Sequence, residues 1–243
     1  MQPFQFWGIL EPLNQFMYRI FCLFLLVLCP VVGFGQESVT RSVESFRSLR
    51  VNGPLDVRLV KGTKPSVRIE TEGFPIGEVR TTVSGSSLRI DLENYVLKTK
   101  SNIDVWVTYT ELDRIVCTGA CNVFSSETLQ VKSIDLEAST ASTIEIEVQS
   151  ERMFIMAATA GQVIVSGTTD FLDIESATSA SVEADRLTAG QVQVDARTAS
   201  TVKVNAQKAI EATITTAASL RYKGNPEKTN LQSATGGSIR KPD

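Results

Sequence analysis

The feature that most constrains the fold is an internal repeat of about 19 residues in the second half of the chain. Seven segments rich in Ala, Ser and Thr align with one another: 117–123, 138–144, 157–163, 176–182, 196–202, 214–220 and 233–239. Their last residues are all aliphatic and are spaced 21, 19, 19, 20, 18 and 19 positions apart. Such a repeat, with two short strands and a corner, is typical of a parallel β-solenoid, in which each turn packs on its neighbours.

Equivalent positions of the repeats support this interpretation. The position two residues before each segment is always aliphatic: Ile115, Leu136, Ile155, Ile174, Val194, Ala212 and Leu231. Both strands of each turn are therefore expected to point one face into a shared core. The third corner position is Gly119 and then Thr in the other six repeats. Because stacked strands lie ~4.8 Å apart, these Thr side chains can exchange hydroxyl hydrogen bonds, and we assign them an architectural role.

Strands are also predicted before the repeats. Apolar and polar residues alternate strictly at 55–59, 88–92 and 103–107, which is the pattern of half-buried strands. The links between these strands are longer and less regular, so residues 36–112 are expected to form a cap or wider first turns, followed by regular repeats over 113–243. The predicted fold is all-β: a single-domain parallel β-helix (β-solenoid).

The first 35 residues resemble a secretory signal peptide. Residues 20–32 form an apolar run of 13 residues that follows Arg19 and precedes two small residues, Gly33 and Gly35. A membrane-spanning helix needs ~20 apolar residues, so we favour cleavage after Gly35 over a retained anchor. A start at Met17 is an open alternative, and a lipoprotein anchored through Cys29 ranks lower. The mature chain would cover 36–243 and would act in the periplasm, on the outer-membrane surface or outside the cell.

Composition excludes several kinds of chemistry. The chain has no histidine, which rules out Ser-His-Asp and Cys-His catalysis and His-ligated metals. Its 24 Lys and Arg against 27 Asp and Glu give a net charge of −3, without the basic balance expected of a nucleic-acid-binding protein. We expect no cofactor and no metal site. Cys117 and Cys121 flank one corner, and the sequence leaves open whether they form a disulfide or remain two small buried thiols.

Outward positions hold the candidate site residues. Asp173, Glu175 and Asp195 fall on one predicted face of neighbouring turns, where carboxylates could bind Ca²⁺ or act as an acid and base on a sugar. We favour the simpler interpretation that strand exteriors are acidic for solubility. Trp106 alternates out of phase with its buried neighbours. It is either a sugar-stacking platform or, as we favour, a side chain covered by the irregular N-terminal part.

A second outward column ends in basic residues. Lys203, Arg221 and Arg240 fall at equivalent positions of the last three repeats. They could meet an anionic glycan or a lipid head group, although a solvated face is the simpler interpretation.

Several stretches resemble a known family. They are VESF at 43–46, LRVNGPLDV at 49–57, and LDRIVCTG at 112–119, which leads into the Ala/Ser/Thr-cornered repeats. Together they resemble the auto-transporter adhesin head GIN domain family, over nearly the whole mature chain. The resemblance implies a right-handed β-helix, export in Bacteroidota-type bacteria and an adhesive role in the cell envelope, and it supplies no catalytic residues. The glycine expected at the corner entry persists here only at Gly119.

Three functions follow as hypotheses. The first is a non-enzymatic exported envelope protein, adhesin-like, with a glycan or a cell-surface protein as partner, no nucleic acid and no membrane span after cleavage. The alternative is a carbohydrate-active β-helix, a lyase or hydrolase that uses Asp or Glu with Arg or Lys, for example Arg197. The third, an amphiphile-binding role, depends only on the outward Phe154 and Met156. The links between turns are short, which favours the first hypothesis because a catalytic groove needs long flanking loops.

Overall fold

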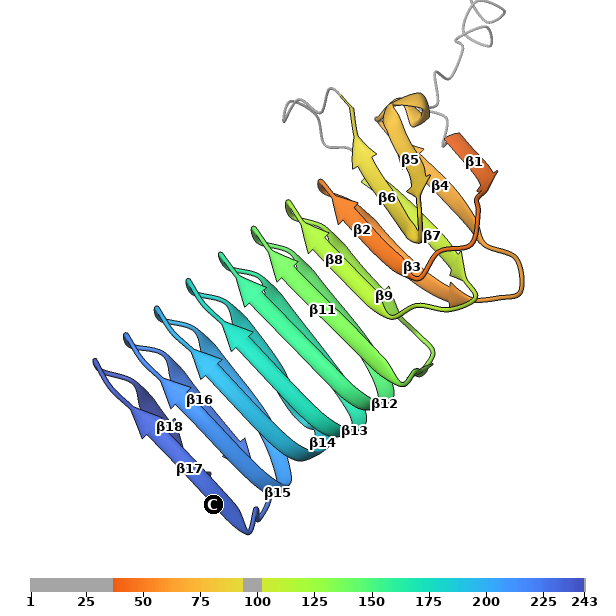
Figure 1. The fold of residues 1–243 in the computed structure, drawn as a ribbon. Helices are drawn as coiled ribbons and strands as arrows, with labels where there is room; N and C mark the ends of the chain where they lie inside the picture. The colour runs from red at the N-terminus through yellow and green to blue at the C-terminus, as the bar shows by residue number, and fades with distance from the viewer. Residues whose placement is uncertain (1–36, 94–101, 243) are drawn as a thin grey trace, which may run out of the picture. The chain divides into compact units, whose positions relative to one another are not determined.

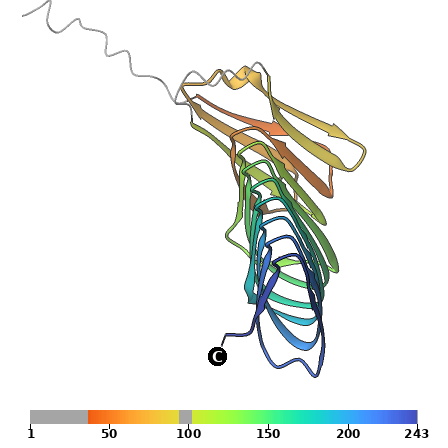
Figure 2. The same cartoon turned by 90° about the vertical axis from the view of Figure 1, so that its left-hand side faces the viewer.

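The structure is a computed structural model that describes residues 37–93 and 102–242. These residues form a stack of flattened coils, each coil being one full turn of a β-solenoid (Figures 1 and 2). The predicted signal peptide, residues 1–35, lies outside the described residues. In the described ranges no helix is long and apolar enough to cross a membrane.

The strands are β1 (Glu37–Ser42), β2 (Ser48–Asn52), β3 (Asp56–Lys61), β4 (Ser66–Glu72), β5 (Val79–Ser84), β6 (Ser87–Leu92), β7 (Asn102–Tyr109), β8 (Arg114–Thr118), β9 (Asn122–Ser125), β10 (Leu129–Gln130), β11 (Ser133–Ser139), β12 (Thr143–Ala158), β13 (Gln162–Ser176), β14 (Ser181–Ala196), β15 (Thr201–Ile214), β16 (Ser219–Lys223), β17 (Lys228–Ser233) and β18 (Ser238–Arg240). A short 3₁₀ helix, η1 (Ile76–Glu78), precedes β5.

Each coil has two flat faces. Face A is formed by β6, β2, β8, β11, β17 and the second halves of β12 to β15, and face B by β7, β3, β9, β16, β18 and the first halves of β12 to β15. A tight corner leads from face A to face B, and a wide bend leads from face B to the next coil. Like residues stack in parallel register, as in Ile144 with Val163 and Ile155 with Ile174. All four side chains are fully buried. The predicted single-domain β-solenoid is confirmed.

The tight corners place β-branched residues in the left-handed region. At one corner Thr178 and Ser179 have φ angles of 56° and 60°, a conformation that costs an L-residue about 1–2 kcal/mol. A backbone ladder holds the stack: the N–H of Ser179 donates to the carbonyl of Thr198 at 2.9 Å, and the other corners repeat this bond. In the described coils the backbone therefore carries the ladder that we had expected from the Thr hydroxyls.

The N-terminal strands do not stack in chain order. The first coil, β2–β3, lies between β6–β7 on one side and β8–β9 on the other. After the first coil, the chain forms β6 and β7 on one side of it. It then returns to the other side, where β8 and β9 begin the regular stack. Beyond β7 the sheet becomes antiparallel, with β4 next to β7 and β1 next to β4, while β5 and β6 form a hairpin.

Candidate functional site

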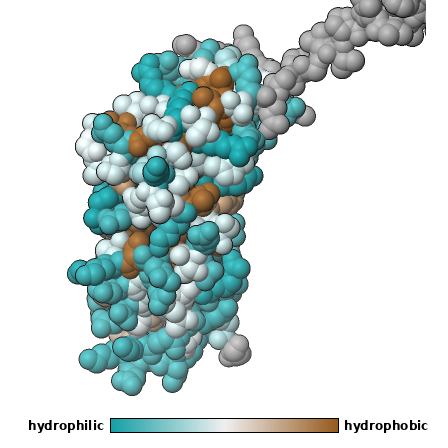
Figure 3. Space-filling view, turned by 90° about the vertical axis from the view of Figure 1, so that its right-hand side faces the viewer, coloured by the Kyte–Doolittle hydropathy of each residue, from teal (hydrophilic) through white to brown (hydrophobic). Residues whose placement is uncertain are grey.

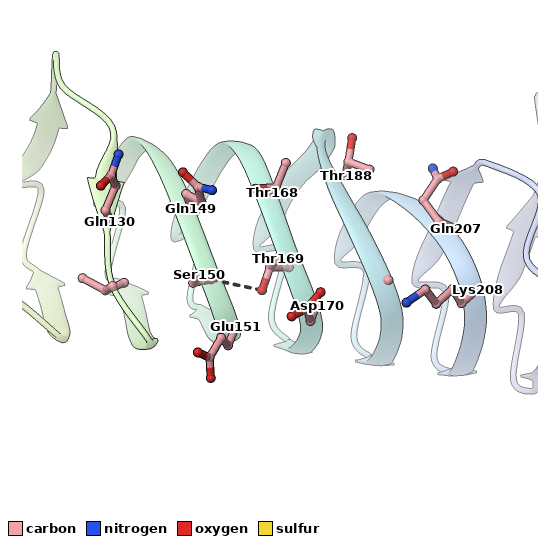
Figure 4. Close-up of a pocket in the computed structure, with 12 residues that line it drawn as sticks. Gln130, Gln149, Ser150, Glu151, Thr168, Thr169, Asp170, Thr188, Gln207 and Lys208 are labelled. Carbon is pink, nitrogen blue, oxygen red and sulfur yellow. Dashed lines mark hydrogen bonds between the residues drawn. The ribbon is translucent and has the colours of Figure 1, made fainter.

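An open groove runs along the wide bends of the regular coils (Figure 4). It has a volume of about 610 Å³ and crosses five successive coils. One margin carries an exposed amide or hydroxyl in each coil: Gln130, Gln149, Thr168, Thr188 and Gln207. Each of the first three residues is aligned directly with the next one on the adjacent strand. The side chains therefore repeat at the inter-strand spacing of ~4.8 Å.

The floor of the groove is polar and closely packed. The Ser150 hydroxyl donates to Thr169 Oγ1 at 3.0 Å, and the Thr169 hydroxyl donates to the carbonyl of Phe171 at 3.2 Å. Thr169 is only 5% exposed, so these bonds fix the floor. Glycine allows the backbones to approach here, because a Cβ at Gly190 would lie 2.7 Å from the Asp170 carbonyl oxygen.

Charged side chains occupy the other margin of the groove. Glu151 and Asp170 follow the floor residues in adjacent coils, and Lys208 lies at the C-terminal end (Figure 4). All three are exposed to solvent. The groove thus offers mainly neutral hydrogen-bond donors and acceptors, arranged in a line. This arrangement suits a linear, hydroxyl-rich ligand better than a small molecule, which needs enclosure and apolar walls.

The predicted carboxylates come together, but outside the groove. Glu175 and Asp195 are register neighbours on face A, and Asp173 lies two residues before Glu175 on the same face. Burial, and then the charge of Glu175, raises the pKa of the Asp173 carboxyl. Asp195 forms a 3.3 Å ion pair with Arg197. Among the described residues, no cluster of three or more His, Cys, Asp and Glu is arranged to hold a metal ion.

Trp106 lies between two arginines. The guanidinium of Arg58, on β3, lies 5.2 Å from the ring centroid, and that of Arg68, on β4, lies 5.1 Å from it. Asp104 pairs with Arg58 at 2.5 Å, and Glu70 pairs with Arg68. The two guanidinium groups lie over the indole ring, where a stacked sugar would otherwise bind. Both arginines come from strands that flank β7 in the N-terminal part of the chain.

The structure contains a disulfide between Cys117 and Cys121, whose Cα atoms lie 6.0 Å apart. It bridges the corner that contains Gly119 and Ala120, with φ angles of 82° and 64°. Both cysteines are fully buried, and neither lines the groove.

Sequence reasoning missed the groove because it followed the strand faces, and the groove lies where strands bend. A signal was present: Gln149, Thr168 and Thr188 are polar residues at corresponding places between face B and face A. Gly167 and Gly190 mark the same bends.

The stacked coils, with a polar groove along their wide bends, define the protein as a repetitive β-solenoid. The sequence matches the family described as "Putative auto-transporter adhesin, head GIN domain" over residues 45–226, and the chain belongs to this family. Comparison with curated protein sequences finds no match.

Solved structures share the fold. A protein described as a "putative adhesin" from Bacteroides fragilis has a TM-score of 0.80 and 18% identity, with 86% of this chain and 98% of that chain covered. A second "putative adhesin", from Parabacteroides merdae, has a TM-score of 0.66 and 12% identity, with 86% and 96% covered. A protein from Parabacteroides distasonis described as a "putative lipid binding protein" has a TM-score of 0.61 and 17% identity, with 85% and 97% covered.

Proposed function

We propose that this protein is an exported, non-enzymatic, adhesin-like module of the cell envelope that binds a neutral glycan along the wide-bend groove. The row of neutral amides and hydroxyls, one in each of five coils, carries the proposal. Gln side chains both donate and accept hydrogen bonds, as do Thr hydroxyls, so they match the hydroxyl groups of a sugar. A linear polymer with a repeating unit would meet the same chemistry at each coil.

The family supports an adhesive role, because its description and those of similar folds refer to adhesins. The catalytic alternative has less support. A glycosidase needs two carboxyl groups across the scissile bond, one of them kept protonated by an apolar site. Glu151 and Asp170, the carboxylates of the groove, are both exposed. Asp173, whose pKa is raised, lies on face A, outside the groove.

The test uses the chain from residue 36 to residue 243. The purified protein is applied to an array of neutral and acidic polysaccharides, and any binding is quantified by calorimetry. The variant Gln149→Ala/Thr168→Ala removes two adjacent groove side chains and, at about 1 kcal/mol for each hydrogen-bonding group, is expected to weaken binding about 30-fold. The matched control Thr213→Ala/Gln232→Ala removes the same two residue types from exposed, neighbouring positions on face A.

Retention of affinity in the control and loss in the groove variant would support the proposal. An equal affinity in the two variants, or no binding to any polysaccharide, would contradict it. Cleavage of a bound polysaccharide during prolonged incubation would instead establish the enzymatic alternative.

A further inference from the structure

Charge is unevenly divided along the mature chain. Residues 201–243 contain seven Lys or Arg and three Asp or Glu, whereas residues 36–200 contain 16 and 23. Residues 228–242 of the last coil include Lys228, Arg240 and Lys241, and the acidic residues Glu227 and Asp243 flank this stretch. The C-terminal end is therefore cationic on a protein that is acidic elsewhere.

Three of these cations form a ladder on face B. Lys203 on β15, Arg221 on β16 and Arg240 on β18 are direct register neighbours in the last three coils. Like charges directly opposite one another destabilise a sheet, so fold stability does not explain the ladder. Glu183 pairs with Lys203 at 3.3 Å. Within the described ranges, Arg221 and Arg240 have no ion-pair partner.

A concavity of about 300 Å³ lies beside this ladder. Its lining consists of Asp185, Lys203, Arg221, Lys223 and Pro242. Lys223 reaches Asp185 at 2.8 Å, two coils toward the N-terminus, and this ion pair occupies one side of the concavity. The guanidinium of Arg221 remains available on the other side. Arginine is suited to this position because its planar fork can bind two oxygens of one phosphate group.

Besides the ladder on face B, the C-terminal end carries a cation on its other face. Lys228 lies on face A and Arg240 on face B of the last coil, whose strands β17 and β18 pair only with the preceding coil in the described chain. On the face drawn in Figure 3, the lower part of the molecule, toward the C-terminal coils, is mostly hydrophilic. Cations at an open edge also oppose end-to-end pairing of two copies. That role does not require Arg221 or Lys203, which lie one and two coils from the edge.

We propose that the C-terminal end of the solenoid docks on an anionic lipid surface, with Arg221 and Arg240 binding the phosphate groups of lipid heads. Charge complementarity favours an anionic partner, and the cations on both faces of the last coil, Lys228 on face A and Arg240 on face B, favour a planar one.

The test measures co-sedimentation of the 36–243 chain with vesicles of phosphatidylcholine alone, or of equal parts of phosphatidylcholine and phosphatidylglycerol. Binding is expected only to the second kind, and it should fall as salt is added. Because each Lys or Arg near an anionic surface contributes about 1 kcal/mol, Arg221→Gln/Arg240→Gln is expected to weaken binding about 30-fold. Arg221→Lys/Arg240→Lys keeps both charges and should retain most of the binding.

The matched control is Arg50→Gln/Arg152→Gln, which makes the same charge change at exposed arginines several coils away. Its affinity should stay within about threefold of the unmodified chain, because those sites lie beyond a Debye length of about 10 Å. Equal losses in the two Gln variants would show a general charge effect and overturn the proposal. Absence of binding to the phosphatidylglycerol vesicles would also overturn it. Competition by inorganic phosphate at constant ionic strength would confirm that phosphate itself is recognised, and its failure would contradict the assigned role of the two arginines.

Discussion

Gly167 lies where β13 enters the wide bend, and its replacement by alanine tests how the coils stack. Its φ angle is +111°, and it pairs with Val148 and Leu187 in the two adjacent coils. A Cβ added at this position would lie 2.0 Å from the carbonyl oxygen of Val148, whereas ordinary contacts of a Cβ begin at 3.4 Å. The obstacle is backbone, so no side chain can rotate away to relieve the overlap.

Two costs add in Gly167→Ala. The positive φ angle costs an L-residue about 1–2 kcal/mol. Moving the Val148 peptide away from the new methyl group disturbs a buried ladder, and a buried peptide group that loses its hydrogen bond costs about 1–3 kcal/mol. The expected loss in the free energy of unfolding is therefore about 2–5 kcal/mol, which is a large share of the 5–15 kcal/mol typical of a native protein.

Urea unfolding followed by circular dichroism measures this loss against two controls. Gly85→Ala adds a methyl group at a φ angle of +58° with no atom within 4 Å, so it isolates the conformational cost, and about 1 kcal/mol is expected. Gly77→Ala, in η1, also meets no atom within 4 Å and has no positive φ, so stability should stay the same or rise slightly. A loss at Gly167 no larger than the loss at Gly85 would refute the argument from backbone overlap.

Four further predictions concern single features of the fold. Trp106→Ala removes two cation–π contacts of about 0.5–1 kcal/mol each, so we expect urea unfolding to show a free energy of unfolding lowered by about 1–2 kcal/mol, with unchanged glycan affinity; a loss of glycan binding would contradict the structural role. Reduction of the Cys117–Cys121 disulfide should cost about 2 kcal/mol, because the loop it closes is short, and alkylation of the untreated protein, detected by mass spectrometry, would contradict the bond. Asp173→Asn should raise the melting temperature at neutral pH, because a pKa raised above 3.8 means that the folded state loses stability as pH rises through that pKa. Asp185→Asn should lower it, because Lys223 lowers the pKa of Asp185, so its contribution is present above 3.8 and is lost as pH falls; identical shifts in the two variants would contradict these assignments.

The strands and their register could be predicted because the same physical constraint recurs in every coil. Ile155 and Ile174 fall at equivalent repeat positions, and the structure stacks them directly. Burial allows only one register, since a shift by one residue would turn the aliphatic column outward. The backbone conformation of the tight corners was harder to predict from the sequence. Local preference opposes a positive φ at Thr178, and the backbone hydrogen bonds that this corner makes with the two adjacent coils offset that cost.

The order of the first coils could not be predicted because it depends on pairing between strands distant in sequence. Arg50 lies between Arg89 and Val116 in the stack, although 39 residues separate it from the first and 66 from the second. Alternation indicates that each segment is a strand but does not identify its neighbours. The Arg58–Trp106–Arg68 contact follows from this order, so sequence reasoning could identify Trp106 as outward-facing without identifying what covers it.

The two connections within a coil differ in how much change they tolerate, and this difference accounts for the location of the groove. From Gly119 onward, each described tight corner uses two left-handed residues and, except in the last coil, donates a backbone bond to the next coil, so an insertion there would break the ladder. The variation in repeat length falls instead at the wide bends: the 20-residue interval from Val182 to Val202 coincides with a register shift between Ala184 and Thr188. The bend side chains that face solvent, such as Gln149, Thr168 and Thr188, have few packing constraints, so they can differ between coils without cost to the core. A ligand-binding surface can therefore change at the wide bends while the rest of each coil preserves the stack.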